Sequence, residues 1–227
     1  KAKGWPEIPA AVPGNVELDL LAAGRIKNPE VGNNVNDLRP YEAYQWWYSR
    51  TFDTPKLGRG ERAELVFEGL DCLGTIWVND RLVGRTDNMF IAHAFDIAEA
   101  LAPAGSGPNT LSVRIDPAVI EGRKYLNGVL VTRHDSGAEG VNLRKAPHMY
   151  GWDIMPRLVS AGLWRGVYLD VKRPTWLRQV YWMTNTVDVA ARTAQLILDW
   201  DLVTDRPTVD GLFLEVSLKR DGRPVHE

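Results

Sequence analysis

The chain has 227 residues, which is enough for one large domain or two smaller ones. Hydrophobic residues make up 44% and charged residues 25%, and this balance excludes disorder as the general state of the chain. The formal net charge of -2 gives no electrostatic basis for binding nucleic acid or an anionic membrane. No apolar run approaches the roughly 20 residues that a membrane-spanning helix needs.

The N-terminal stretch from Lys1 to Pro9 lacks the apolar core of a secretion signal. A signal removed ahead of Lys1 would place the protein in the periplasm or outside the cell, so the sequence leaves the compartment open. The first predicted element is a helix over residues 16–23. Asn15 is a suitable N-cap for this helix, and Gly24 is a typical stop.

Alternating apolar and polar residues predict that strands dominate the rest of the chain. Residues 75–78 and 81–83 are separated by Asn79-Asp80, a pair that tolerates the positive φ angles of a tight hairpin. The other predicted strands cover residues 63–67, 111–115, 167–171, 196–202 and 212–218. Two further turn signals lie at Asp96–Leu101 and at Asp221-Gly222. Short strands separated by turns are typical of a β-sandwich.

The segment from Pro117 to Ala161 shows little helical or strand periodicity, although it is rich in Tyr, Trp, His and Arg. Long irregular segments in compact domains are usually functional or disordered, and this composition favours an ordered binding surface. A domain boundary is predicted after Arg173, where a strand ends at Pro174. The first domain would cover residues 1–173. The second, residues 174–227, is too short to bury a core alone and is therefore predicted to be truncated.

Few residues have the spacing that catalysis or metal binding requires. The single cysteine, Cys72, lies between Leu70 and Leu73 and is predicted to be a small buried apolar residue. Ser136 and Ser160 lie near histidines in the sequence, which is weak evidence for a nucleophilic triad. The metal-ligand candidates are His134 with Asp135 and His148 with Asp153. Neither pair has a known ligand spacing, so the histidines are interpreted as hydrogen-bonded loop or core residues, and no metal or cofactor is predicted.

The constellation Tyr150-Gly151-Trp152-Asp153 has the chemistry of sugar recognition. An aromatic ring can cover the C–H face of a pyranose, and an adjacent carboxylate can accept hydrogen bonds from two hydroxyl groups. The structural alternative is that Trp152 is a core residue and that Asp153 pairs with Arg157 or with a backbone amide. Apart from this constellation, the residues indicate a β-rich binding or scaffolding module without a visible catalytic centre.

Several segments follow one another in an order and spacing that resemble a known family. They are residues 12–16 and 19–21, 26–34, 46–52, 67–72 with 76–79 and 87–90, 142–146 with 151–156, and 162–164. Together these segments resemble the N-terminal region of family 2 glycoside hydrolases of the β-mannosidase type. The resemblance covers about residues 5 to 173, and the stretch from Asn142 to Trp164 is its most diagnostic part.

The resemblance implies an all-β chain, with a jelly-roll (galactose-binding-like) sandwich followed by a partial immunoglobulin-like sandwich. In the family, a (β/α)8 barrel with two catalytic glutamates comes next, and it would lie after residue 227. The family reaction is retaining hydrolysis of a terminal β-linked sugar. A jelly-roll loop carries a Trp-Asp pair to the barrel mouth, where it helps to hold the sugar. Trp152 and Asp153 match that pair, so the resemblance implies that they bind the carbohydrate substrate.

The chain departs from the family pattern at this loop. β-Mannosidases commonly read Trp-Asp-Trp-Gly-Pro, whereas this chain has Ile154 and Met155 between Asp153 and Pro156. The aromatic wall is therefore thinner, and Trp46-Trp47-Tyr48 is similar to the exo-β-glucosaminidase branch, so the terminal sugar is not fixed as mannose. The chain alone is expected to be catalytically inactive. The alternative functions are an independent carbohydrate-binding module and a purely structural buttress of the catalytic barrel.

Overall fold

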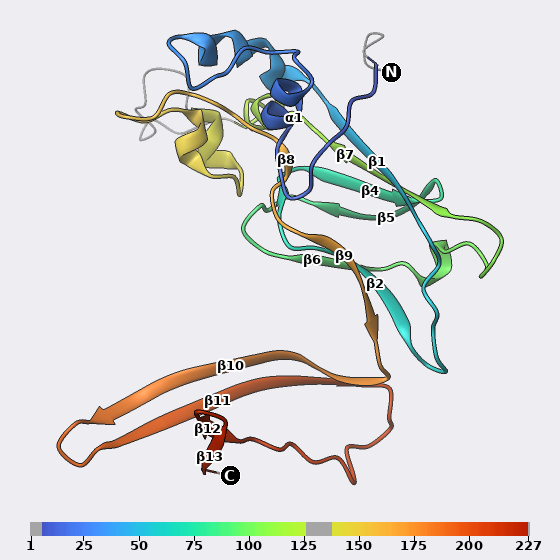
Figure 1. Cartoon of the computed structure of the whole chain (residues 1–227), viewed down its shortest axis with the longest axis vertical. Coiled ribbons are helices and arrows are strands. Elements are labelled where there is room, and N and C mark those ends of the chain that lie inside the picture. Colours follow the sequence, from blue (N-terminus) through green and yellow to red (C-terminus); the bar gives the residue numbers. More distant parts are fainter. Residues whose placement is uncertain (1–5, 126–137, 227) are drawn as a thin grey trace. The chain divides into compact units, whose positions relative to one another are not determined.

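The structure is a computed structural model that describes residues 6–125 and 138–226. The chain divides into two compact units, Lys1–Val171 and Lys172–Glu227 (Figure 1). This division lies two residues before the predicted domain boundary. The identity of the second unit as an immunoglobulin-like domain stays a prediction, and the two units are described separately.

The first unit contains two main β-sheets and one small ladder (Figure 1). The four-stranded sheet has the order β1-β7-β4-β5, and its pairings are antiparallel. Its strands are β1 (Trp46–Phe52), β4 (Gly74–Val78), β5 (Arg81–Thr86) and β7 (Asn109–Ile115). The three-stranded sheet has the order β6-β2-β9, with β2 (Arg62–Phe67), β6 (His93–Asp96) and β9 (Val167–Lys172). The ladder pairs β3 (Leu70–Asp71) with β8 (Gly162–Leu163).

One apolar core cluster draws side chains from both main sheets. The predicted apolar face of residues 63–67 is confirmed, because Ala63, Leu65 and Phe67 are all buried, although Val66 on the other face is buried too. Residues 111–115 show the same pattern on β7. These side chains pack with others from β4, the β3–β8 ladder and the turn after β6, and the cluster as a whole comprises Ala63, Leu65, Phe67, Leu70, Ile76, Val78, Ile97, Ala100, Leu111, Val113, Ile115 and Leu163.

The predicted hairpin between β4 and β5 is confirmed. Asn79 and Asp80 have φ angles of 52° and 64°, the left-handed values that a two-residue hairpin turn requires. The Asn79 side chain also fixes the turn to β7. Its Oδ1 accepts a hydrogen bond from the Thr110 amide at 2.9 Å, and its Nδ2 donates to Oδ1 of Asn109 at 2.8 Å.

Short helical segments make up the rest of the first unit. The predicted first helix is confirmed as α1 (Val16–Ala22), in which Oδ1 of Asn15 accepts a hydrogen bond from the Leu18 amide at 2.9 Å. The remaining segments are η1 (Asn34–Ala43), η2 (Ala98–Ala100), α2 (Ala118–Gly122), η3 (Ala138–Asn142) and η4 (Pro147–Tyr150). Segment η2 follows Asp96, whose Oδ1 accepts a hydrogen bond from the Ala98 amide. In the described ranges, no helix is long and apolar enough to cross a membrane.

The second unit consists of two hairpins. The longer one pairs β10 (Thr175–Asp188) with β11 (Thr193–Thr204), and the shorter one pairs β12 (Leu218–Arg220) with β13 (Arg223–His226). The turn at Asp221-Gly222 is confirmed, with φ angles of 52° and 77°. The predicted strand over residues 212–218 is wrong, because strand structure begins only at Leu218. An alternating pattern forms a strand only when a neighbouring strand takes up its backbone hydrogen bonds, and in the described part of the chain residues 212–217 pair with none.

Candidate functional site

A loop from Asn142 to Arg157 carries the residues that the sequence singles out. Its first stem is fixed by Lys145, whose side chain is fully buried. Lys145 Nζ lies 2.5 Å from Oδ2 of Asp71 on β3 and donates to the Ser160 carbonyl at 2.5 Å. Ser160 Oγ in turn donates to Oε2 of Glu17 on α1 at 2.5 Å. The stem is therefore tied both to the small ladder and to the first helix.

Burial sets the electrostatics of this stem. Removal from water raises the pKa of Asp71, and the neighbouring Lys145 opposes that effect. Burial also raises the pKa of Glu17, against the hydrogen bond from Ser160. Two carboxyl groups and one ammonium group thus share a space from which water is almost excluded. Such a network holds its geometry strongly, because breaking the Lys145–Asp71 link leaves a buried charge without its partner and breaking the other links leaves buried polar groups without hydrogen bonds.

The second stem is fixed by Arg157. Its Nη2 lies 2.6 Å from Oε2 of Glu42 on η1 and 2.8 Å from Oε1 of Glu139 on η3, and all three side chains are largely buried. The Arg157 guanidinium also lies 5.3 Å from the centre of the Tyr150 ring. Tyr150 is buried against Val119 and Val159, and this burial raises the pKa of its hydroxyl group.

Between the two stems, the tip of the loop forms a tight turn that is exposed to solvent. Gly151 has a φ angle of 99°, which favours glycine, and it begins the turn. The Trp152 amide donates to the Met155 carbonyl at 3.0 Å, and the Met155 amide donates to the Trp152 carbonyl at 3.2 Å. Trp152 is 58% exposed, Asp153 is exposed, and Ile154 is 89% exposed.

The structure therefore places Trp152 and Asp153 side by side on an exposed tip. The alternative in which Trp152 is a core residue does not match its exposure. Arg157, the alternative partner of Asp153, binds Glu42 and Glu139. Within the residues that the structure describes, no hydrogen bond or ion pair of Asp153 is found. The role of the two residues in sugar recognition stays a prediction.

Among the other sequence candidates that the structure describes, Cys72 and Ser160 have structural surroundings. Cys72 is 1% exposed, and burial raises the pKa of its thiol to about 12, which confirms the prediction of a buried apolar residue. Ser160 serves as a link to Glu17. His134, Asp135 and Ser136 lie outside the described residues. Over the described ranges, no three His, Cys, Asp or Glu side chains are grouped as metal ligands.

The sequence analysis missed the two charged anchors of the loop. Asp71 stands between Leu70 and Cys72 and so interrupts an apolar stretch, which was the available signal, whereas Lys145 follows Arg144 and gives no such signal. A fully buried lysine is rare without a partner, but the burial of Lys145 is known only from the fold. Pairing two such residues 74 positions apart required knowledge of the fold.

Residues 1–165 match the family described as the glycosyl hydrolase 2 galactose-binding domain-like domain. The chain belongs to this family. The predicted membership in family 2 glycoside hydrolases is confirmed. The family match and the two antiparallel sheets together confirm the predicted jelly-roll sandwich.

Curated relatives of this family 2 chain are β-mannosidases of fungi. Beta-mannosidase B of Aspergillus clavatus is 32% identical over 170 residues, which cover 74% of this chain and 20% of that protein. Beta-mannosidase B of Aspergillus niger is 31% identical over 198 residues, covering 86% of this chain and 23% of that protein. The chain thus spans about a fifth of the length of these relatives.

Solved structures support the same assignment. The β-D-mannosidase of Dictyoglomus thermophilum has a TM-score of 0.74 and 32% identity, and the match covers 89% of this chain and 24% of that one. An exo-chitosanase of Amycolatopsis orientalis has a TM-score of 0.64 at 18% identity, covering 99% of this chain and 23% of that one. At 18% identity, the similarity to the exo-chitosanase shows a shared fold and nothing about function.

Proposed function

We propose that this family 2 chain is the non-catalytic part of a retaining exo-glycosidase of the β-mannosidase type. The parent enzyme would hydrolyse a terminal β-linked sugar with two glutamates of a (β/α)8 barrel that lies outside residues 1–227. In this proposal the loop from Asn142 to Arg157 reaches the substrate pocket of that barrel. Trp152 and Asp153 hold the terminal sugar there.

The proposal rests on one observation: the loop tip at Trp152 and Asp153 is exposed, while the two stems that carry it are fixed by buried charged residues. The stems are held by Lys145 with Asp71 and by Arg157 with its two glutamates, so the tip is positioned before any substrate arrives. The tip exposes the contiguous apolar residues Trp152, Ile154 and Met155 beside the Asp153 carboxylate, and contiguous exposed apolar groups mark interaction sites. Preorganisation of this kind lowers the entropic cost of binding.

The chemistry of the tip suits one end of a pyranose. The Trp152 ring can cover a C–H face of the sugar, and the Asp153 carboxylate can accept hydrogen bonds from two neighbouring hydroxyl groups. Ile154 and Met155 stand where β-mannosidases commonly have Trp and Gly, so one aromatic wall of the pocket is replaced by aliphatic surface. This substitution supports a preference among terminal sugars that differs from that of typical β-mannosidases.

The test is Asp153→Asn in the full-length parent enzyme. The variant loses a charged acceptor, and hydrogen bonds to charged groups contribute about 1.5–3 kcal/mol. At 1.36 kcal/mol per factor of ten, we expect kcat/KM to fall roughly 10- to 100-fold. Steady-state kinetics on p-nitrophenyl β-mannoside and β-glucosaminide measure this fall and show which sugar the enzyme prefers.

The matched control is Asp53→Asn, which removes the same charge from an exposed position just after β1. It is expected to leave kcat and KM unchanged. If Asp153→Asn also leaves both constants unchanged, Asp153 does not bind the sugar and the first unit acts as a structural buttress. An independent binding module would instead show sugar affinity in the absence of the barrel, and Trp152→Ala would remove that affinity.

We infer that residues 174–227 begin an immunoglobulin-like sandwich. Strands β10 and β11 have 14 and 12 residues, and apolar side chains are exposed on both faces of their hairpin. Tyr181 and Trp182 are adjacent in β10 and therefore point to opposite faces, and they are 56% and 48% exposed. A two-stranded ribbon cannot bury such surfaces by itself, and further strands of the same sandwich would cover them.

A further inference from the structure

A row of side chains crosses the outer face of the four-stranded sheet, away from the loop tip. Trp47 on β1 is paired with Arg114 on β7, Arg114 with Thr75 on β4, and Thr75 with Arg85 on β5. Directly paired residues point to the same face of a sheet. Their neighbours Val113 and Ile76 belong to the core, so the row lies on the opposite face.

Two tryptophans on this face form a stacked platform. The ring centres of Trp47 and Trp77 lie 5.4 Å apart with an interplanar angle of 16°. The Arg114 guanidinium carbon lies 6.0 Å and 5.5 Å from the two ring centres. Trp47 is nevertheless 56% exposed, so its indole is held in place by its neighbours while much of its surface contacts water.

Hydrogen bonds orient this platform and join it to a chain of polar groups. Trp47 Nε1 donates to Oε1 of Gln45 at 3.2 Å, and Gln45 Nε2 donates to Oδ1 of Asp116 at 2.5 Å. Arg114 Nη2 donates to Oδ2 of Asp116 at 2.9 Å and lies 3.4 Å from Oγ1 of Thr75. Gln45, Asp116 and Arg114 therefore form a polar rim beside the Trp47 indole, in which hydrogen-bond donors and acceptors alternate.

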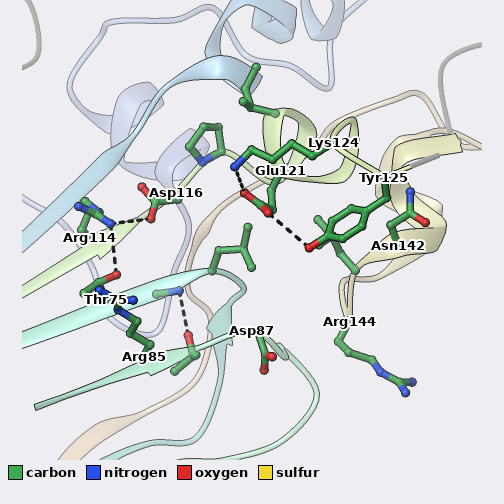
Figure 2. Close-up of a pocket in the computed structure, with 16 residues that line it drawn as sticks. Thr75, Arg85, Asp87, Arg114, Asp116, Glu121, Lys124, Tyr125, Asn142 and Arg144 are labelled. Atoms are coloured by element: carbon green, nitrogen blue, oxygen red, sulfur yellow. Dashed lines mark hydrogen bonds and ion pairs between the residues drawn. The ribbon is translucent and has the colours of Figure 1, made fainter.

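This rim continues into a cavity of about 700 Å³ (Figure 2). Figure 2 shows two sides of the opening. Glu121 of α2 and Tyr125 of the turn after it lie on one side, and Thr75 and Asp87 lie on the other. A volume of this size is within the roughly 300–1,000 Å³ of small-molecule sites. The lining ends at Arg144 on the loop and does not include the tip at Trp152 and Asp153.

The charges of the cavity are nearly balanced. Its lining holds four basic side chains, Arg85, Arg114, Lys124 and Arg144, and three acidic ones, Asp87, Asp116 and Glu121. Arg114 pairs with Asp116 at 2.9 Å, and Lys124 pairs with Glu121 at 2.6 Å. An anionic ligand would meet three carboxylates among these four basic side chains. A neutral molecule with many hydroxyl groups could use both the donors and the acceptors.

We propose that the Trp47–Trp77 platform and the adjoining cavity form a second carbohydrate site, which takes a neutral glycan chain. One pyranose ring packs on the exposed indole of Trp47. The next sugar units extend over Arg114 and Asp116 into the cavity, where their hydroxyl groups meet balanced donors and acceptors. This site is additional to the loop tip and does not depend on the function proposed for it.

The test measures glycan binding by the full-length parent protein with isothermal titration calorimetry. The probes are hexaoses of β-1,4-mannose, β-1,4-glucose and β-1,3-glucose, each blocked at its non-reducing end against exo-hydrolysis, with oligogalacturonate as the anionic probe. We expect at least one neutral hexaose to bind and oligogalacturonate not to bind. Trp47→Ala should weaken that binding at least 10-fold, because stacking on the indole is lost, whereas Trp47→Tyr should retain most of it.

Two controls separate this site from the loop tip and from general damage. Tyr168→Ala removes another exposed aromatic ring, from β9 in the other sheet, and should leave hexaose binding unchanged. Trp152→Ala should impair hydrolysis and leave hexaose binding intact. The proposal is overturned if no neutral hexaose binds at millimolar concentration, if only oligogalacturonate binds, or if Trp152→Ala abolishes binding while Trp47→Ala does not. Equal melting temperatures of Trp47→Ala and the unaltered protein exclude unfolding as the cause of a loss.

Discussion

Lys145 and Asp71 form the most deeply buried ion pair among the described residues, with side chains that are 0% and 4% exposed. Taking two charges out of water is costly, and their attraction offsets that cost only while both partners are present. The pair thus fixes the position of the loop stem and contributes little net free energy to folding. Its role in positioning follows from the link that Lys145 also makes to the Ser160 carbonyl.

Lys145→Met is expected to lower the free energy of unfolding by about 3–5 kcal/mol, because Asp71 would remain buried without its partner. Denaturant titration measures this loss. The control is Lys124→Met, which removes an ammonium group from an exposed pair with Glu121 and should change stability little. In the double variant with Asp71→Leu, part of the lost stability should return. If Lys145→Met alone is as stable as the unaltered protein, Asp71 does not need Lys145 as its buried partner.

Glu17 makes the stability of the fold depend on pH. Its pKa is raised by burial, so the folded state keeps a proton that the unfolded state has released. Its contribution to stability is complete below the ordinary carboxyl pKa and decreases as the pH rises toward the raised folded value. Glu17→Gln keeps an acceptor for Ser160 but cannot ionise, so this variant should be more stable than the unaltered protein at pH 7.

The measurement is thermal unfolding across a pH series. The advantage of Glu17→Gln should disappear as the pH falls below the ordinary carboxyl value, and Glu30→Gln, at an exposed position, should show no such trend. An advantage that grew on acidification would mean that the ionised form of Glu17 is stabilised in the folded state, in contradiction to the burial argument.

At the scale of elements, the small β3–β8 ladder joins the loop to α1. Gly162 on β8 is paired with Asp71, and Gly14 and Asn15, which directly precede α1, pass over it. A Cβ atom at residue 162 would lie 2.7 Å from the Asn15 Cα and 2.7 Å from the Gly14 carbonyl oxygen. Both atoms belong to the backbone, so no side-chain rotation can relieve the contact.

Gly162→Ala is therefore expected to destabilise the first unit by about 1–3 kcal/mol, the usual range for overpacking. Chemical denaturation followed by tryptophan fluorescence checks this value. Gly166→Ala is the matched control, because the nearest atom to its added Cβ is a carboxylate oxygen of the exposed Glu68 side chain, which can move away. Equal effects of the two substitutions would show that the close backbone approach at Gly162 is not rigid.

At the scale of the whole molecule, the first unit has a complete apolar core, whereas the second leaves large apolar side chains exposed along both strands of its long hairpin. This difference explains why periodicity predicted one region better than the other. The strands in residues 63–67 and 111–115 form where expected because each lies between two hydrogen-bonded partner strands. Residues 212–217 alternate just as regularly but have no described partner strand, and they do not form one.

The sequence by itself determined the features that depend on local chemistry. The cap at Asn15, the turn at Asn79-Asp80, the buried Cys72 and the family signature around Trp152 and Asp153 all follow from neighbouring residues. Steric limits on φ, side-chain hydrogen bonds to nearby amides and period-two alternation act over a few positions. A single sequence therefore records them directly.

Only the tertiary structure decided which distant residues meet. It joined Lys145 to Asp71 across 74 positions and Arg157 to Glu42 across 115, and it placed Trp47 against Trp77 over an intervening strand. Such contacts depend on strand order and sheet packing, which periodicity leaves undetermined. The exposure of the Trp152 indole also belongs here, because burial is a property of the packed fold and not of the residue type.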